Sequence, residues 1–262
     1  MTVSRMTVGG VAALSLMAIA AYPASAQEKL VATDASVRTI VAFKVSDTAL
    51  QKFVPGGWQS SPFSAGPSKG ANLIVVFIQP VVVQGPDGKA QDLIPLAALN
   101  FPAKRTGTDA TVGMVFAGFA SNASYVPGPY GAFELAKANV EQNVRTDPTG
   151  TSSVQESWEF RADNGSGIEF QVQYVRGLAV RGKVESTPHS AKTPDFYRIY
   201  RVDQAADVVR STATGMDRAQ KVTFKAVGQP LAQLFDGTEQ LISITSIPLY
   251  TRQLFLPGGS TQ

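Results

Sequence analysis

Short apolar runs and a period-two alternation of apolar and polar residues recur along the chain, and both patterns predict β-strands. The segment 72–78 reads Asn-Leu-Ile-Val-Val-Phe-Ile and is apolar on both faces, so it predicts a central strand that is covered on both sides. Glycine and proline interrupt the chain throughout, as in a domain with many turns. The strands that these patterns predict are 39–43, 72–78, 81–83, 111–120, 222–226, 241–247 and 252–256.

The clearest local element is a β-hairpin. Two segments, 154–162 and 168–176, flank Asp163-Asn-Gly-Ser-Gly167, which contains an Asn-Gly turn signal. We expect a five-residue loop that pairs Ala162 with Ile168. The other pairs in this register are Arg161 with Glu169, Phe160 with Phe170, Trp158 with Val172 and Glu156 with Tyr174.

This register brings polar groups to the apolar face of the hairpin. Glu156 shares that face with Trp158 and lies opposite Tyr174, and Arg176 is diagonal to it. One interpretation is a polar cluster in a cavity, because buried polar groups must find partners or a ligand. The other is a strand end that emerges into solvent and carries a surface salt bridge.

Three helices are also predicted. The first covers 48–54 and has Ser46 or Asp47 as its N-cap. The longest is expected over 131–144, and a short one over 205–211. The apolar residues with helical spacing in the longest segment, which lie beside Lys137, are Phe133, Ala136, Val140 and Val144.

The first 26 residues have the pattern of a secretory signal peptide. Arg5 is the only charge before Glu28, and an apolar run over 8–21 is followed by Ala24-Ser25-Ala26. The run is shorter than the roughly 20 apolar residues that a membrane-spanning helix needs. We therefore expect cleavage after Ala26 and a single periplasmic or secreted domain over 27–262, without stable membrane insertion. The alternative is an uncleaved anchor.

Composition excludes several classes of protein. The net charge of +3, or +2 without Arg5, and the scattered basic residues give no electrostatic footprint for nucleic acid. The chain has no cysteine, which excludes thiolate catalysis, iron–sulfur clusters and cysteine-based zinc sites. His189 is the only histidine and lies in a proline-flanked loop, so multi-histidine metal centres are excluded and a catalytic triad is not expected. We expect neither a metal nor an organic cofactor.

The order of these pieces resembles the acetoacetate decarboxylase-like superfamily. Leu50-Gln-Lys-Phe-Val-Pro-Gly-Gly-Trp58 resembles the early helix and turn of that family, and Gly131-Ala-Phe-Glu-Leu-Ala136 stands where the family has Gly-Phe-Pro-Lys-Lys-Leu-Ala. The hairpin follows, and segments 228–235 and 247–257 resemble the closing strands. The resemblance implies an α+β, mainly antiparallel fold: a double β-cone or barrel-like domain with a few short helices and a central apolar cavity.

The chain departs from the family at its catalytic motif. In the decarboxylases two adjacent lysines act together, and one forms a Schiff base with the ketone. Here those places read Phe133 and Glu134, and no Lys-Lys pair occurs anywhere in the chain. On the predicted helix, Lys137 would share a face with Phe133 and could replace the missing amine. The alternative is an exposed Glu134–Lys137 ion pair.

Two functions follow from this reading. The first is an exported enzyme, a lyase-like catalyst with an altered site, that acts on a small carbonyl compound or oxo acid. Lys137 would be the nucleophile, Glu156 would transfer a proton and Arg176 would bind a substrate carboxylate. The second is a non-catalytic binding protein whose cavity holds a small organic ligand. The residues expected to line that cavity are Tyr174, Arg176, Glu156, Phe133 and Trp158.

A third interpretation is a structural envelope protein that forms homo-oligomers. Exposed edge strands that contain Lys221 and Leu254 would mediate the assembly.

Overall fold

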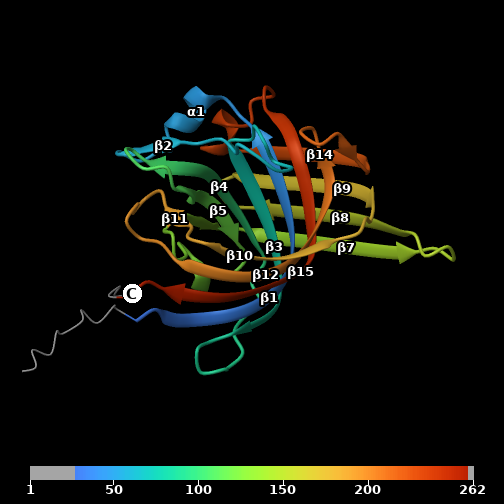
Figure 1. Cartoon of the computed structure of the whole chain (residues 1–262), viewed down its shortest axis with the longest axis horizontal. Coiled ribbons are helices and arrows are strands. Elements are labelled where there is room, and N and C mark those ends of the chain that lie inside the picture. Colours follow the sequence, from blue (N-terminus) through green and yellow to red (C-terminus); the bar gives the residue numbers. More distant parts are fainter. Residues whose placement is uncertain (1–26, 259–262) are drawn as a thin grey trace, which may run out of the picture.

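A computed structural model describes residues 27–258, which form two β-sheets with one short α-helix among the described residues (Figure 1). The signal-peptide prediction lies outside these residues. The large sheet contains β1 (Lys29–Lys44), β3 (Leu73–Gln84), β4 (Leu96–Arg105), β5 (Thr111–Ala120), β10 (Val180–Ser186), β11 (His189–Ser190), β12 (Ile199–Ser211) and β15 (Gln240–Leu256). The small sheet contains β7 (Lys137–Thr146), β8 (Ser152–Arg161), β9 (Gly167–Val175) and β14 (Ala219–Val227).

The strand orders are β10–β12–β15–β1–β3–β4–β5–β11 in the large sheet and β14–β9–β8–β7 in the small one. Most neighbours are antiparallel. Short strands β2 (Trp58–Ser60), β6 (Phe133–Leu135) and β13 (Met216–Asp217) pair at the margins of the large sheet. The remaining elements are α1 (Asp47–Gln51), η1 (Ala123–Tyr125) and η2 (Leu231–Gln233). The mainly antiparallel fold predicted from the sequence is confirmed, and within residues 27–258 no helix is long and apolar enough to cross a bilayer.

The large sheet curls so that its two ends approach each other. His189 in β11, at one end of the sheet, forms a bridge with Tyr197, two residues before β12 begins. Because β12 lies near the opposite end of the strand order, this bridge brings β5 and β12 to two sides of one concave space. The curl creates the cavity described below.

One predicted helix is present and two are strands. Ser46 caps α1, its side chain accepting from the Ala49 amide at 3.4 Å, and the helix ends at Gln51. The predicted helix over 131–144 is wrong, because this segment forms β6 and then β7, and all ten residues of β7 pair with β8. The predicted helix over 205–211 is also wrong, because it lies inside β12. Pairing with neighbouring strands outweighs the weak local helical spacing in both cases.

The hairpin between β8 and β9 is present, but its register differs by two residues from the prediction. Phe160 pairs with Ile168, and the turn over 162–166 is closed by the Ala162 amide, which donates to the Ser166 carbonyl at 2.9 Å. Because side chains alternate with a period of two, a two-residue shift keeps every side chain on its predicted face. Arg161 and Glu169 are therefore diagonal neighbours that still form an ion pair at 2.8 Å.

The main core fills the space between the two sheets. Leu73, Val75 and Phe77 point from β3 toward the small sheet and are fully buried. The Phe77 ring stacks on Trp158 at 5.5 Å and on Phe170 at 5.4 Å between ring centroids. Aromatic pairs at this spacing contribute beyond the area that they bury.

A buried carboxylate joins the two sheets within this core. Glu156 of β8 is only 2% exposed and accepts hydrogen bonds from the Thr39 hydroxyl of β1, from Trp158 Nε1 at 3.1 Å and from the Tyr174 hydroxyl at 2.8 Å. Ser246 of β15 lies 2.8 Å from the same tyrosine oxygen. We call these five residues the Glu156 cluster. Burial, reinforced by the Glu156 carboxylate, raises the pKa of Tyr174. The phenol therefore keeps its proton at neutral pH and acts as a hydrogen-bond donor.

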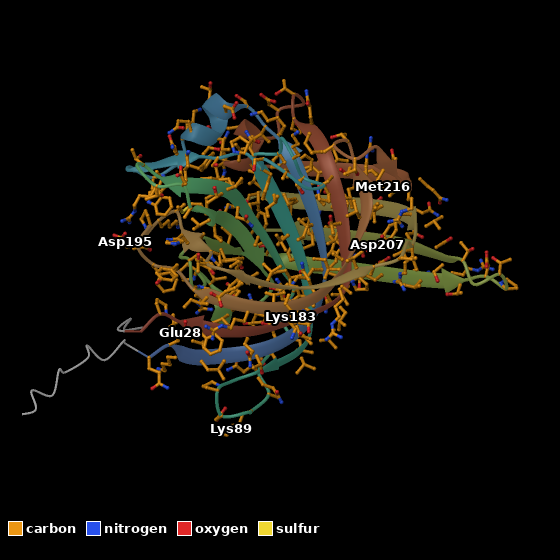
Figure 2. All side chains as sticks on the ribbon, in the orientation of Figure 1. Glu28, Lys89, Lys183, Asp195, Asp207 and Met216 are labelled. Atoms are coloured by element: carbon orange, nitrogen blue, oxygen red, sulfur yellow. The ribbon has the colours of Figure 1, made fainter. Side chains whose placement is uncertain are left out.

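The free edges of the sheets differ from the prediction in one place. β14, which contains Lys221, is an edge strand of the small sheet, whereas Leu254 lies in β15 between β12 and β1. The strand that contains Leu254 has neighbours on both sides and therefore cannot pair with an edge strand of another copy. β10 is an edge of the large sheet and all seven of its residues are exposed, including Lys183, which lies on the surface (Figure 2).

We expect Glu156→Gln to lower the free energy of unfolding by about 1–3 kcal/mol, because an amide offers one acceptor fewer to three buried donors. Urea denaturation followed by circular dichroism measures the change. Glu169→Gln, on the exposed face of the same hairpin, is the control and should cost less than about 1 kcal/mol. Equal losses for the two variants would contradict a role for the Glu156 cluster in holding the sheets together.

Candidate functional site

The concave face of the large sheet encloses a cavity of about 430 Å³ on the side away from the small sheet. On β1, Thr39 points to the Glu156 cluster, and its neighbour Arg38 points into the cavity. On β3, Val76 and Ile78 line the cavity and alternate with the core residues. The other apolar lining residues include Ile94, Leu96, Ala98, Val115, Tyr125, Phe133 and Leu254.

Two arginines share one carboxylate in the wall of this cavity. Arg252 Nε donates to Asp34 at 2.7 Å, and an Arg38 Nη atom donates to the same carboxylate at 3.3 Å. Arg38 also donates to the Ser36 hydroxyl at 2.8 Å, and its guanidinium carbon lies 3.3 Å from the centre of the Tyr250 ring. Burial lowers the pKa of Arg38 to about 10, so it remains charged at neutral pH.

A pair of tyrosine hydroxyls lies next to these arginines. The Arg252 guanidinium carbon lies 4.2 Å from the centre of the Tyr200 ring, and the Tyr200 hydroxyl is 2.5 Å from that of Tyr130. Burial, and next the neighbouring Tyr200, raise the pKa of Tyr130, so this hydroxyl keeps its proton. Two bonded hydroxyls carry two protons and use one between them, which leaves one for a further acceptor.

A third arginine lines the cavity without a partner for one of its donors. Arg198 lies just before β12, two residues from Tyr200, and both side chains line the cavity. Its Nε is buried and has no hydrogen-bond partner among the described residues. An unmade hydrogen bond on a buried charged group is costly, and such a group therefore marks a place where a ligand atom fits.

Phe133 occupies a slot at the cavity wall. Its ring lies between Gly118 of β5 and Gly128, where an added Cβ atom would approach the ring to 2.6 Å and 2.7 Å. Tyr125 packs edge-on against the same ring at 5.7 Å. Both glycines are needed here because any side chain would collide with the phenyl ring.

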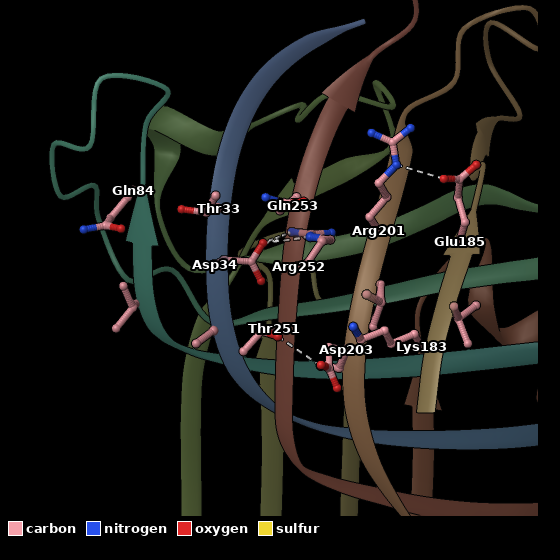
Figure 3. Close-up of a pocket in the computed structure, with 14 residues that line it drawn as sticks. Thr33, Asp34, Gln84, Lys183, Glu185, Arg201, Asp203, Thr251, Arg252 and Gln253 are labelled. Atoms are coloured by element: carbon pink, nitrogen blue, oxygen red, sulfur yellow. Dashed lines mark hydrogen bonds and ion pairs between the residues drawn. The ribbon is translucent and has the colours of Figure 1, made fainter. Parts of the chain in front are cut away.

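A larger open depression of about 650 Å³ lies on the outer face of β10, β12, β15 and β1 (Figure 3). Its lining has as many acidic as basic side chains, and it shares Asp34 and Arg252 with the inner cavity. Arg201 pairs with Glu185 at 2.9 Å, and Asp203 accepts both ends of Arg181. The inner cavity, where positive charge exceeds negative charge, is therefore the better candidate for a binding site.

The residues predicted from the sequence divide between three places. Glu156, Tyr174 and Trp158 come together as expected, but in the core between the sheets and not in the lining of the cavity. Phe133 lines the cavity. Arg176, which was expected beside Glu156, is exposed just after the end of β9.

Lys137 does not share a cavity with Phe133. The segment is a strand, so Lys137 points outward from β7 while Ala138 points inward. The lysine side chain is 88% exposed and its Nζ lies 3.8 Å from Asp163. The alternative pairing with Glu134 is also wrong, because Glu134 accepts from the Ser166 hydroxyl at 2.8 Å. No lysine is among the described residues that line the cavity.

Sequence reasoning missed the charged residues of the cavity. Arg38 stands in the apolar run Val37-Arg-Thr-Ile-Val41, and Arg252 stands in Leu249-Tyr-Thr-Arg-Gln-Leu254. An arginine at an inward position of an apolar strand is the signal that could have identified both. The third member of this group, Arg198, is in a loop and offers no such signal. Within residues 27–258, no cluster of three acidic or histidine side chains could hold a metal ion.

No protein-family model matches the sequence, and no curated protein matches it. Solved structures do match. The enduracididine biosynthesis enzyme MppR complexed with pyruvate is 13% identical, with a TM-score of 0.53 over 96% of this chain and 98% of that one. Acetoacetate decarboxylase from Legionella pneumophila is 11% identical, with a TM-score of 0.52 over 94% and 92% of the chains. An acetoacetate decarboxylase-like enzyme from Sphingomonas wittichii is 11% identical, with a TM-score of 0.51 over 93% and 96%.

These similarities extend over nearly the whole of each chain, whereas the sequence identities are too low to carry over an activity. They agree with the sheet arrangement that the sequence resemblance implied. The chain therefore has the acetoacetate decarboxylase-like fold.

Proposed function

We propose that the protein binds a small organic anion, an oxo acid or a related carbonyl carboxylate, in the cavity of the large sheet, and that it does so without forming an imine. The observation that carries this proposal is the excess of guanidinium groups in the cavity wall. Arg38, Arg198 and Arg252 all line the cavity, and the one buried carboxylate among the described lining residues is Asp34, which pairs with Arg38 and Arg252.

The charge of the arginines in the cavity wall must be compensated. A buried cation is costly unless an anion and hydrogen-bond acceptors compensate it. Asp34 can compensate one of the three arginines, and Asp92, the other acidic residue that lines the cavity, is exposed. A ligand carboxylate would supply the missing charge and accept two parallel N–H bonds from one guanidinium.

The comparisons add support for an oxo acid. MppR, which has a similar fold, is described in complex with pyruvate, and pyruvate is a small 2-oxo acid. A volume of about 430 Å³ with a mostly apolar lining is typical of small-molecule pockets and has room for an oxo acid larger than pyruvate.

Binding is favoured over Schiff-base catalysis because no lysine is among the described residues that line the cavity. Phe133 fills the wall where the sequence resemblance places a catalytic lysine, and Lys137 faces solvent. Glu156 holds three hydrogen bonds in the core and does not face the cavity, so it is not positioned to transfer a proton to a ligand.

We expect pyruvate to bind and pyruvamide, its neutral analogue, not to bind, in calorimetric titrations at low ionic strength. Arg38→Met should weaken pyruvate binding by about ten-fold or more, the value of a charged hydrogen bond, while Asp34 keeps Arg252 as its partner. Arg201→Met, on the outer face of the same sheet, is the control and should bind pyruvate as the unaltered protein does. Equal affinities for pyruvate and pyruvamide would contradict the proposal.

Treatment with pyruvate or acetoacetate and a hydride reductant should leave the intact mass of the protein unchanged, because no amine lines the cavity. Peptide mass spectrometry locates any adduct, and Lys137→Ala serves as the control. A stoichiometric adduct on a single lysine would show that imine formation occurs after all.

We also propose that the protein is exported, on the strength of the leader pattern in its first 26 residues. Expression of the full chain in a bacterial host should give a periplasmic protein whose N-terminal sequence starts at Gln27. Ala26→Leu should block cleavage by placing a large side chain at the small-residue site. Recovery of the uncleaved chain from the cytoplasm would contradict export.

A further inference from the structure

The positive charge in the cavity is divided between two places. At one, which we call the paired pole, Arg38 and Arg252 share Asp34, so two positive charges face one negative charge. At the other, which we call the free pole, Arg198 has a buried donor without a partner among the described residues. The paired pole therefore has one positive charge in excess of Asp34 and Arg198 supplies another, while Asp92, the remaining acidic residue of the lining, is exposed.

Contacts connect both poles to the phenol pair. Tyr200 stacks under Arg252 of the paired pole, and its hydroxyl meets that of Tyr130. Tyr130 packs edge-on against Phe196, in the loop segment that precedes Arg198. Both Arg198 and Arg252 act on Tyr125 and Tyr130, whereas Arg252 and Asp34, but not Arg198, act on Arg38.

The phenol pair supplies a neutral donor between the poles. One of its two protons is used in the bond between the hydroxyls, and the other is available to a ligand oxygen. A carbonyl oxygen needs only a neutral donor, whereas a carboxylate is best matched by a guanidinium.

Resting on the proposed function, we infer that the ligand is a short-chain oxo dicarboxylate that spans the cavity. One carboxylate binds the paired pole through Arg38 and Arg252, and the other binds Arg198. The oxo group lies near the Tyr130–Tyr200 pair, and the apolar walls from β3 and β4 contact the carbon chain. No bond is made or broken in this step, because the inference concerns recognition alone.

The test compares 2-oxoglutarate with its 5-methyl ester, which keeps the oxo acid end and removes one negative charge. Calorimetric titrations at fixed ionic strength should give an affinity at least about ten-fold higher for the dicarboxylate, because a second charged hydrogen-bonded pair contributes about that factor. Glutarate, which lacks the oxo group, should bind more weakly than 2-oxoglutarate and lose less of its affinity in Tyr130→Phe.

The decisive variant is Arg198→Met. It should weaken the binding of 2-oxoglutarate about ten-fold and leave the methyl ester unaffected, so that the two ligands bind alike. Arg201→Met is the matched control. It removes an arginine from the same part of the chain, but the Arg201 side chain pairs with Glu28 and Glu185 on the outer face. Thermal unfolding of each variant shows that the fold is retained.

The outcomes separate this inference from the proposed function. If the ester binds as tightly as the dicarboxylate, or if Arg198→Met weakens both equally, the two-pole inference is wrong, while the proposed anion site stands. If none of the anionic probes binds, both the inference and the proposed function are overturned.

Discussion

The alternation of side chains along β1 is the constraint on which both polar centres of this molecule depend. Successive residues of a strand point to opposite faces of its sheet. Arg38 and Thr39 are therefore sent to two different environments, one into the concave cavity and the other into the core against the small sheet. A shift of one residue in the pairing of β1 would exchange them, leaving a cation in the apolar core and a hydroxyl in the cavity.

The two polar centres differ in whether their buried polar groups have hydrogen-bond partners. Glu156 forms no ion pair among the described residues, and neutral donors from three side chains satisfy its carboxyl group. This centre is complete and has no remaining function to assign beyond joining the sheets. The cavity lining holds more cations than anions, and Arg198 has a donor without a partner among the described residues, which is why we propose that a ligand binds there. Satisfaction of hydrogen bonds separates a structural cluster from a binding site more clearly than burial does.

The β-rich class, seven of the fifteen strands of the described residues and the resemblance to the fold could be predicted from the sequence, because strand periodicity and turn residues are local signals. The predicted helices over 131–144 and 205–211 were wrong, because the local signals in both segments, including the helical spacing of four apolar residues in the first, competed with pairing partners that only the tertiary fold supplies. Sequence reasoning brought Glu156 and Tyr174 together correctly despite a two-residue error in register, because the error preserved their faces. It could not locate the cavity, which depends on the curl of the sheet and on Arg38, Arg198 and Arg252 arriving from segments more than 50 residues apart.

The slot around Phe133 has a consequence for protein engineering. Two glycines and the edge of Tyr125 form a flat recess that fits an aromatic ring. A lysine placed at 133 would leave most of that recess empty, and its amine would enter a cavity wall already rich in positive charge, which favours the neutral, reactive form but costs stability. Installing amine chemistry on this scaffold therefore calls for coordinated redesign at 118, 128 and 133, and a single substitution is a poor starting point for directed evolution toward a decarboxylase.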